Sequence, residues 1–166
     1  MSHVSTAVLL VAALALAACN NPDRYGAGGA GGIDSTGLGG ANDPASVAYF
    51  NQTVGDRVLF AVDQYSLDDA ARATLAGQAR WLMTNGDYAV IIEGHADEQG
   101  TREYNLALGA RRASAVQDFL IAQGVAPSRM RTVSYGKERP IEVCSEEACY
   151  AKNRRAVTVL TQGAGA

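Results

Sequence analysis

Short strand-like segments alternate with longer helix-like segments from Val58 onward. Apolar runs of a few residues that contain β-branched side chains are typical of buried strands. Four such runs occur, at 58–62, 88–93, 130–135 and 156–161. Alternation of strands with amphipathic helices predicts an α/β chain of order β-α-β-α-β, whose last strand completes a mixed β-α-β-α-β-β sheet.

Two helices are expected between the first three strands. The first begins at Ser66 or Asp68 and ends at about Thr84, and the second runs from Thr101 to Gln123. Capping residues precede both segments, and a glycine follows each of them. The apolar positions with helical spacing are Leu75, Ala79 and Leu82 in the first helix and Leu106, Ala110, Ala113, Val116 and Leu120 in the second.

The N-terminal segment is predicted to be a lipoprotein signal peptide. Ala7 to Ala18 reads AVLLVAALALAA, which is uncharged and too short to cross a bilayer, but has the length of a signal-peptide apolar core. It ends in Leu-Ala-Ala followed by Cys19, the pattern of a lipobox. We therefore expect cleavage after residue 18 and lipidation at Cys19; the alternative is an ordinary secretory signal with an incidental cysteine.

A Gly-rich segment separates Cys19 from the strands and helices. Residues 25–40 read YGAGGAGGIDSTGLGG, which offers almost no apolar side chain for packing. We expect a disordered tether over 19–53 and a folded domain over 54–163. A Gly-rich coil of the 35 residues from Asn20 to Val54 would span roughly 30–35 Å on average.

Several function classes have no support in the sequence. The formal net charge is −3, so there is no basic field to attract nucleic acid. A Gly-x-Ser-x-Gly nucleophile motif, a phosphate loop and a His-Glu-x-x-His motif are absent. We therefore expect that the chain is not an enzyme and binds neither a cofactor nor a metal ion.

Three sequence blocks carry a resemblance to a known family. Residues 92–113 (IEGHADEQGTREYNLALGARRA), 133–138 (VSYGKE) and 152–157 (KNRRAV) resemble the OmpA-like peptidoglycan-binding domain, and within that family its wall-associated lipoproteins. The resemblance covers Leu59 to about Leu160. It implies an α+β sandwich in which helices pack on one face of the mixed sheet.

The resemblance also implies a function. Members of the family anchor the outer membrane to the cell wall by binding peptidoglycan without covalent chemistry. The partners implied for this chain are peptidoglycan, a TolB-like periplasmic protein with other Tol components, and the outer membrane through acyl chains on Cys19. The domain would face the periplasm and support envelope integrity and membrane invagination during cell division.

The ligand implied is the diaminopimelate of the peptidoglycan stem peptide, which presents an ammonium group and carboxylates. By the resemblance, Asp97 accepts the ammonium and Arg112 binds a carboxylate, as a planar bidentate donor can. The further ligand-binding residues expected from the family blocks are Asp63, Thr101, Asn105 and Leu108. The alternative for Asp97 and Arg112 is an internal ion pair that orients loop and helix.

Other residues of these blocks are open to more than one interpretation. Gly94, Gly100 and Gly136 are expected to permit turns that a β-carbon would obstruct. Arg154 and Arg155 either support the pocket or provide surface charge. Cys144 and Cys149 are expected to form a disulfide in an oxidising periplasm, with half of a metal site as the competing interpretation.

Two alternative functions remain to be compared with wall binding. If the strand continues past Glu93, alternation places Glu93, His95 and Asp97 on one face, as in a metal-dependent hydrolase, with Glu98 beside them. The second alternative is a periplasmic protein-docking module that has no wall ligand.

Overall fold

The computed structural model describes residues 40–162, which belong to one compact unit, Thr36–Ala166. The predicted signal peptide, Cys19 and the Gly-rich residues before 40 lie outside the described residues. The elements are α2 (Val47–Tyr49), η3 (Phe50–Gly55), β1 (Arg57–Leu59), α3 (Asp69–Thr84), β2 (Tyr88–His95), α4 (Arg102–Ala122), η4 (Pro127–Arg129), β3 (Met130–Gly136), α5 (Glu147–Asn153) and β4 (Arg155–Gln162).

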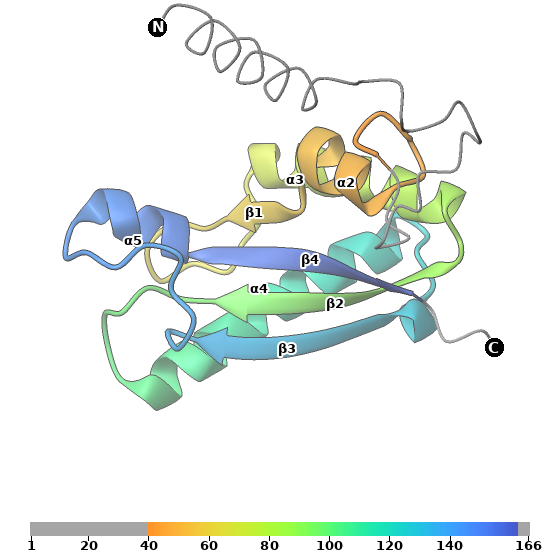
Figure 1. Ribbon diagram of the computed structural model, residues 1–166. Helices are drawn as coiled ribbons and strands as arrows, with labels where there is room; N and C mark the ends of the chain where they lie inside the picture. Colours follow the sequence, from red (N-terminus) through yellow and green to blue (C-terminus); the bar gives the residue numbers. More distant parts are fainter. Residues whose placement is uncertain (1–39, 163–166) are drawn as a thin grey trace, which may run out of the picture. The chain divides into compact units, whose positions relative to one another are not determined.

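The four strands form one mixed sheet in the order β1-β4-β2-β3 (Figure 1). β2 and β3 are parallel, while β4 lies between β1 and β2 and is antiparallel to both. The predicted mixed sheet is therefore confirmed, with the last strand at its centre. The first strand ends at Leu59 instead of the expected residue 62, because the Gln64 amide donates to the Ala61 carbonyl and closes a turn.

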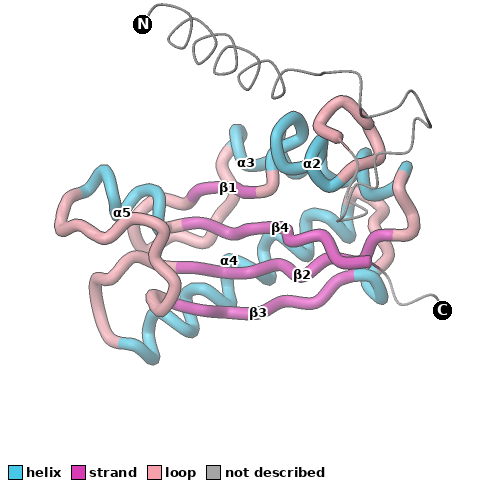
Figure 2. The backbone as a smooth tube through the Cα atoms, in the orientation of Figure 1, coloured by secondary structure: helices cyan, strands magenta, loops and turns pink. Residues whose placement is uncertain are grey.

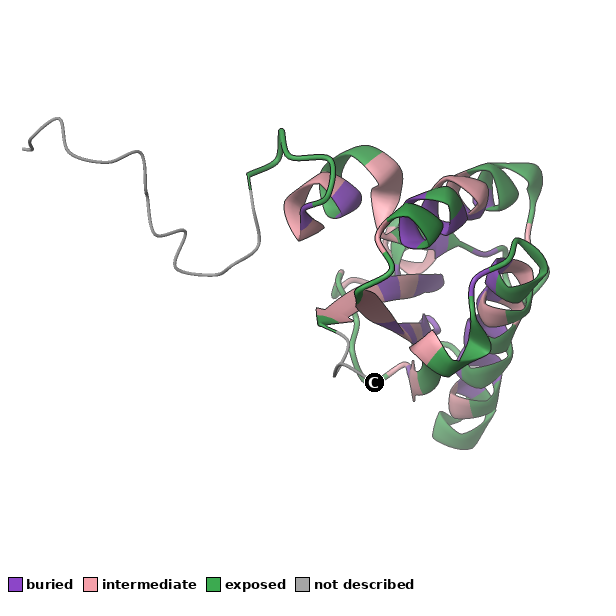
Figure 3. Ribbon diagram, turned by 90° about the vertical axis from the view of Figure 1, so that its right-hand side faces the viewer, coloured by how far each residue is buried: buried purple, intermediate pink, exposed green. Residues whose placement is uncertain are grey.

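The two long helices lie close to their predicted bounds and cover one face of the sheet (Figure 2). Asp68, rather than Ser66, caps α3, since its Oδ1 accepts from the Ala71 amide at 2.7 Å. In Figure 3 the buried parts of the helices and strands face inward. The core contains Leu75, Leu82, Ile92, Val116 and Leu120, among other buried apolar residues.

α4 approaches β2 closely where two glycines face each other. A β-carbon built on Gly94 would lie 1.8 Å from the Gly109 carbonyl oxygen, and one built on Gly109 would lie 2.8 Å from the Gly94 oxygen. The prediction that Gly94 permits a turn is wrong: Gly94 lies within β2 and is required by helix–strand contact. Gly100 and Gly136 do have positive φ, at 91° and 52°.

Ordered structure begins before the expected boundary at Val54. α2 and η3 precede β1, and Phe50 is fully buried against Trp81, with ring centroids 4.9 Å apart. The Trp81 indole Nε1 also donates to the Pro44 carbonyl at 2.7 Å. The domain therefore includes residues that the tether prediction assigned to 19–53, because Phe50 is an apolar anchor for the core.

Candidate ligand-binding site

The predicted ligand residues gather at the carboxyl end of β2. This end of the sheet receives the loop between β1 and α3, the loop between β2 and α4, the first half of α4 and the start of β4. Asp63 comes from the first loop, Asp97 and Thr101 from the second, and Arg112 from α4. Most of the contacts at this end of the sheet join residues far apart in the sequence.

Arg112 is fully buried and is held by backbone carbonyls. Its Nε donates to Gln64 at 2.8 Å, its Nη1 to His95 at 2.8 Å and its Nη2 to Ala61 at 3.2 Å. Within residues 40–162 it forms no ion pair with a carboxylate. The site thus holds a buried guanidinium that donates hydrogen bonds to carbonyl groups and lies over the Phe60 ring, 5.1 Å from its centroid, without a carboxylate in direct contact among the described residues.

The pKa of Arg112 reflects this environment. Burial lowers it to about 10, an effect that Asp97 and Asp63 partly oppose and Arg154 reinforces. At neutral pH the side chain is therefore still a cation. A buried cation without a carboxylate partner is costly, so a carboxylate ligand that reached it would gain a strong, charge-assisted contact.

Asp97 is paired with Arg154 and not with Arg112. Its Oδ2 accepts from Arg154 Nη1 at 3.1 Å, and its Oδ1 accepts from the Gln99 amide at 3.2 Å. Asp97 is 8% exposed, whereas Arg154 is 5% exposed. The alternative of an internal Asp97–Arg112 ion pair therefore does not describe this structure.

Arg154 joins several elements at the site. Besides Asp97 it contacts Glu147 of α5 through Nη1 and Nη2, and its Nε donates to the Phe60 carbonyl at 3.2 Å. The hydrogen bond from Arg154 lowers the pKa of Glu147. Arg154 is therefore a buried link between these elements and not a surface charge; Glu147 was not among the predicted site residues.

The other predicted site residues lie in the loops and helix that surround Asp97 and Arg154. Thr101 caps α4 by accepting from the Tyr104 amide at 3.2 Å, and buried Asn105 donates to the Gln99 carbonyl at 2.8 Å. Asp63 has a positive φ of 55° and accepts from the Tyr104 hydroxyl at 3.3 Å. Leu108 is buried on the same helix, at 3% exposure.

His95 is buried next to the site but is not arranged as a metal ligand. Neither ring nitrogen has a hydrogen-bond partner among the described residues, and burial lowers its pKa to about 4, so the ring is neutral at pH 7. Glu93 Oε2 lies 3.5 Å from Nε2, which for a neutral ring is proximity and not an ion pair. The described part of the chain holds no group of three or more His, Cys, Asp or Glu side chains suited to a metal ion.

The cysteine pair lies in the loop that leads into α5. Cys144 and Cys149 are disulfide-bonded, with their Cα atoms 6.0 Å apart. Next to this loop, buried Asn153 accepts from the amides of Ile141 and Glu142 at 2.9 and 3.2 Å. The segment between β3 and β4 is thus held both covalently and by hydrogen bonds.

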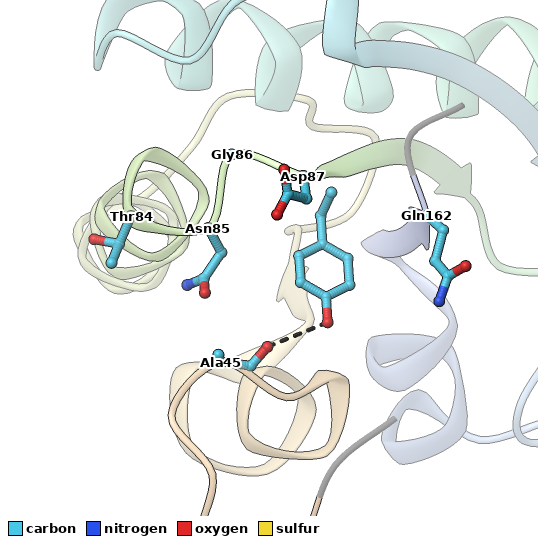
Figure 4. Close-up of a pocket in the computed structure, with 7 residues that line it drawn as sticks. Ala45, Thr84, Asn85, Gly86, Asp87 and Gln162 are labelled. Carbon is cyan, nitrogen blue, oxygen red and sulfur yellow. Dashed lines mark hydrogen bonds between the residues drawn. The ribbon is translucent and has the colours of Figure 1, made fainter. Parts of the chain in front are cut away.

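Two surface hollows lie away from these residues. One of about 460 Å³ is lined by residues that include Ala45, Asn85 and Gln162, and the Tyr88 hydroxyl donates to the Ala45 carbonyl at 3.2 Å (Figure 4). The second lies between η3 and α3 beside Trp81. Both are near the start of β2, so neither includes a predicted ligand residue. No helix within 40–162 is both long and apolar enough to cross a membrane.

Comparison with known proteins gives a consistent result. Residues 59–154 match the OmpA family. The peptidoglycan-associated lipoprotein of Mesorhizobium japonicum is 51% identical over 164 residues, covering 95% of this chain and 92% of the relative. That of Pseudomonas aeruginosa is 42% identical over 137 residues, covering 80% and 81%.

Solved structures agree with the sequence relatives. The peptidoglycan-associated lipoprotein from Burkholderia pseudomallei superposes with a TM-score of 0.65 at 40% identity, covering 73% of this chain and 98% of the other. The C-terminal domain of Helicobacter pylori MotB superposes with a TM-score of 0.61 at 22% identity, and the match covers 66% of this chain and 86% of the MotB chain. It therefore shares the fold. The chain therefore belongs to the OmpA family and, within it, to the peptidoglycan-associated lipoproteins.

Proposed function

We propose that this chain is an outer-membrane lipoprotein that binds peptidoglycan non-covalently at the Asp97–Arg112 site. The observation that carries the proposal is the buried guanidinium of Arg112, which has no carboxylate partner within residues 40–162 and lies near the carboxylate of Asp97. The OmpA family is one of structural peptidoglycan-binding proteins and not of enzymes, so the chain performs no catalysis.

The ligand group is the diaminopimelate of the stem peptide. Its carboxylate binds Arg112, and its ammonium is accepted by Asp97. Because Arg112 is fully buried, the carboxylate must replace a carbonyl contact, and Ala61 and Gln64, which supply two of these carbonyls, are exposed residues of one turn. Binding therefore exchanges carbonyl dipoles for a full negative charge at the same guanidinium.

Attachment to the outer membrane is assigned to Cys19. Cleavage after residue 18 and acylation of that cysteine would give more than one buried acyl chain, which makes anchoring stable rather than transient. The Gly-rich segment then serves as the tether between the membrane and the wall-binding domain. In this arrangement the chain acts in a Tol-Pal system that draws the outer membrane after the wall during cell division.

A TolB-like periplasmic protein is the proposed second partner, on a surface that overlaps the wall site. Four exposed apolar side chains lie on segments that border the site, at the end of β1, in the β1–α3 loop and in the first turn of α4: Leu59 at 50%, Val62 and Tyr65 at 49%, and Tyr104 at 44%. Clusters of exposed apolar side chains mark protein-interaction surfaces. Binding of wall and protein at one mouth would make the two partners compete.

Sedimentation with purified peptidoglycan sacculi tests wall binding. Residues 36–166 should pellet with sacculi, while Asp97→Asn and Arg112→Gln, which each remove a charge, should weaken binding by about 2–5 kcal/mol, the range for loss of a desolvated charge contact. Arg131→Ala is the control, because Arg131 is an exposed arginine at the start of β3, away from the carboxyl end of β2. Circular dichroism must show that each variant is folded.

Two results would refute the proposal. Wild type that stays in the supernatant would leave only the protein-docking function. Folded Asp97 and Arg112 variants that pellet as well as wild type would place the wall contact elsewhere.

A further inference from the structure

The Asp97–Arg154 ion pair includes a third charged residue, Glu147, to which the proposed function assigns no role. Arg154 bonds to Asp97 on one side and to Glu147 on the other. An isolated Asp97–Arg154 pair would be neutral, and a neutral pair attracts an ammonium group only weakly. With Glu147 included, these three side chains carry a net negative charge, while the positive charge of neighbouring Arg112 would be met by the carboxylate of the ligand.

Glu147 is an exposed side chain at the first position of a short helix, so it needs support to stay on Arg154. Its side chain is 66% exposed, and exposed ion pairs are weak because solvent screens them and long side chains lose entropy. The Cys144–Cys149 disulfide encloses Glu147 in a loop with a sequence separation of five. The Cys149 amide also donates to the Glu146 carbonyl at 3.0 Å, which closes the first turn of α5.

We propose that Glu147, held in place by the Cys144–Cys149 disulfide loop, is a positioning residue for wall binding. It shares the Arg154 guanidinium with Asp97 and thereby leaves Asp97 with the negative potential that an ammonium ligand requires. Glu147 acts through Arg154 and does not touch the ligand. This inference rests on the proposed function, since it concerns the same site and the same ammonium group.

The test combines protein variants with a change in the ligand. The probes are the synthetic tripeptide L-Ala-γ-D-Glu-meso-diaminopimelate and the same tripeptide acetylated on its free side-chain amine, each titrated calorimetrically into residues 36–166. Glu147→Gln should weaken binding of the free-amine peptide roughly five-fold, as expected for a partly screened charge, and should leave binding of the acetylated peptide unchanged. Glu146→Gln, an exposed neighbour that forms no ion pair within residues 40–162, should change neither.

The disulfide is tested in the same titrations. The Cys144→Ser, Cys149→Ser double variant should weaken binding of the free-amine peptide in the same direction as Glu147→Gln. Adding Glu147→Gln to that double variant should have little further effect, because both changes remove one interaction and coupled changes are not additive. Fully additive losses would show that the loop does not act through Glu147.

The possible results separate this inference from the proposed function. If wild type binds the free-amine peptide and Glu147→Gln binds it equally well, the inference is wrong while wall binding stands. Equal losses for both peptides would reveal a general structural role and would also overturn it. If wild type binds neither the peptide nor sacculi, the proposed function and this inference fall together.

Discussion

At the scale of single residues, the site depends on close backbone approach as much as on charge. Gly94 and Gly109 let α4 lie against β2, and α4 carries Arg112 one turn beyond Gly109. The Arg112 guanidinium reaches the carbonyl of His95 at 2.8 Å only because helix and strand are in contact. A side chain at either glycine would push the cation away from its carbonyls.

Gly94→Ala tests this close approach. The new β-carbon would overlap the Gly109 carbonyl oxygen, so we expect the free energy of unfolding to fall by about 3 kcal/mol, at the upper end of overpacking costs. Gly77→Ala, in α3, is the control. Its β-carbon would meet nothing closer than Val54 Cγ1 at 3.7 Å, and alanine should add about 0.5–1 kcal/mol of helix stability. Urea unfolding followed by circular dichroism measures both; a Gly94→Ala protein as stable as wild type would contradict the close contact.

His95 gives a pH dependence whose sign can be worked out. Its pKa is lowered from 6.5 to about 4 in the folded protein, first by burial and then by Arg155 and Arg139. The unfolded chain therefore binds the proton more tightly, and stability that is present above pH 6.5 is lost as the pH falls toward 4. Between pH 7 and 4.5 this group alone should cost about 2 kcal/mol.

His95→Phe separates this contribution from that of the carboxylates. Phenylalanine keeps an aromatic ring beside Tyr135, which stacks on His95 with centroids 5.5 Å apart, but cannot be protonated. Urea titrations at several pH values should show a shallower loss of stability for the variant than for wild type. Parallel curves would mean that the histidine is already protonated, or not destabilised by charge, in the fold.

At the scale of elements, the N-terminal helical segment belongs to the domain. Phe50 is fully buried on Trp81, and the Ser46 hydroxyl caps α2 by accepting from the Tyr49 amide at 3.0 Å. A segment that buries an aromatic ring and caps its own helix contributes to the core rather than to a tether. The domain boundary therefore lies on the N-terminal side of this segment.

Phe50→Ala should cost about 3–5 kcal/mol, the range for deleting a buried aromatic side chain. Asn51→Ala changes an exposed neighbour in the same π-helical turn and should stay within about 0.5 kcal/mol of wild type. The midpoint of urea unfolding of residues 36–166 distinguishes the two variants. If both variants unfolded at the same urea concentration, Phe50 would not contribute to the core, and this segment would be part of the tether.

The regular elements could be predicted where their own sequence carries the signal. α3 and α4 have apolar faces and capping side chains at Asp68 and Thr101, so periodicity locates them well. α5 has no apolar face, and its one buried residue is Asn153, so periodicity does not detect it. The same holds for η3, whose single buried residue is Phe50.

The site could be predicted only in part for a related reason. Family resemblance places Asp97 and Arg112 at one end of the fold, but the partners of these residues depend on tertiary contact. Asp97 pairs with Arg154, which is 57 positions away, and Arg112 binds carbonyls 48 and 51 positions away. Every residue has a backbone carbonyl, so a sequence pattern cannot identify which carbonyls will bind Arg112.

At the scale of the whole molecule, the described ends of the chain lie away from the site. Ala45 contacts Tyr88 at the start of β2, and Gln162 at the end of β4 pairs with the same residue. Asp97 follows the other end of β2. Eight strand residues separate these ends, a distance of roughly 25 Å. A domain attached by either end would therefore present the Asp97–Arg112 site outward.

This arrangement makes immobilised binding depend on the point of attachment. Residues 36–166 fixed to a sensor through the N-terminus or through the C-terminus should bind the free-amine tripeptide with affinities within about two-fold of each other, because neither attachment covers the site. Fixing the domain through a p-azidophenylalanine at exposed Glu98, in the β2–α4 loop, should weaken binding more than about ten-fold by blocking entry and holding the loop. Biolayer interferometry compares the three orientations directly. If terminal attachment blocked binding while attachment at Glu98 did not, the ligand would enter at the opposite end of the sheet, where the hollow beside Tyr88 would replace Asp97 and Arg112 as the site.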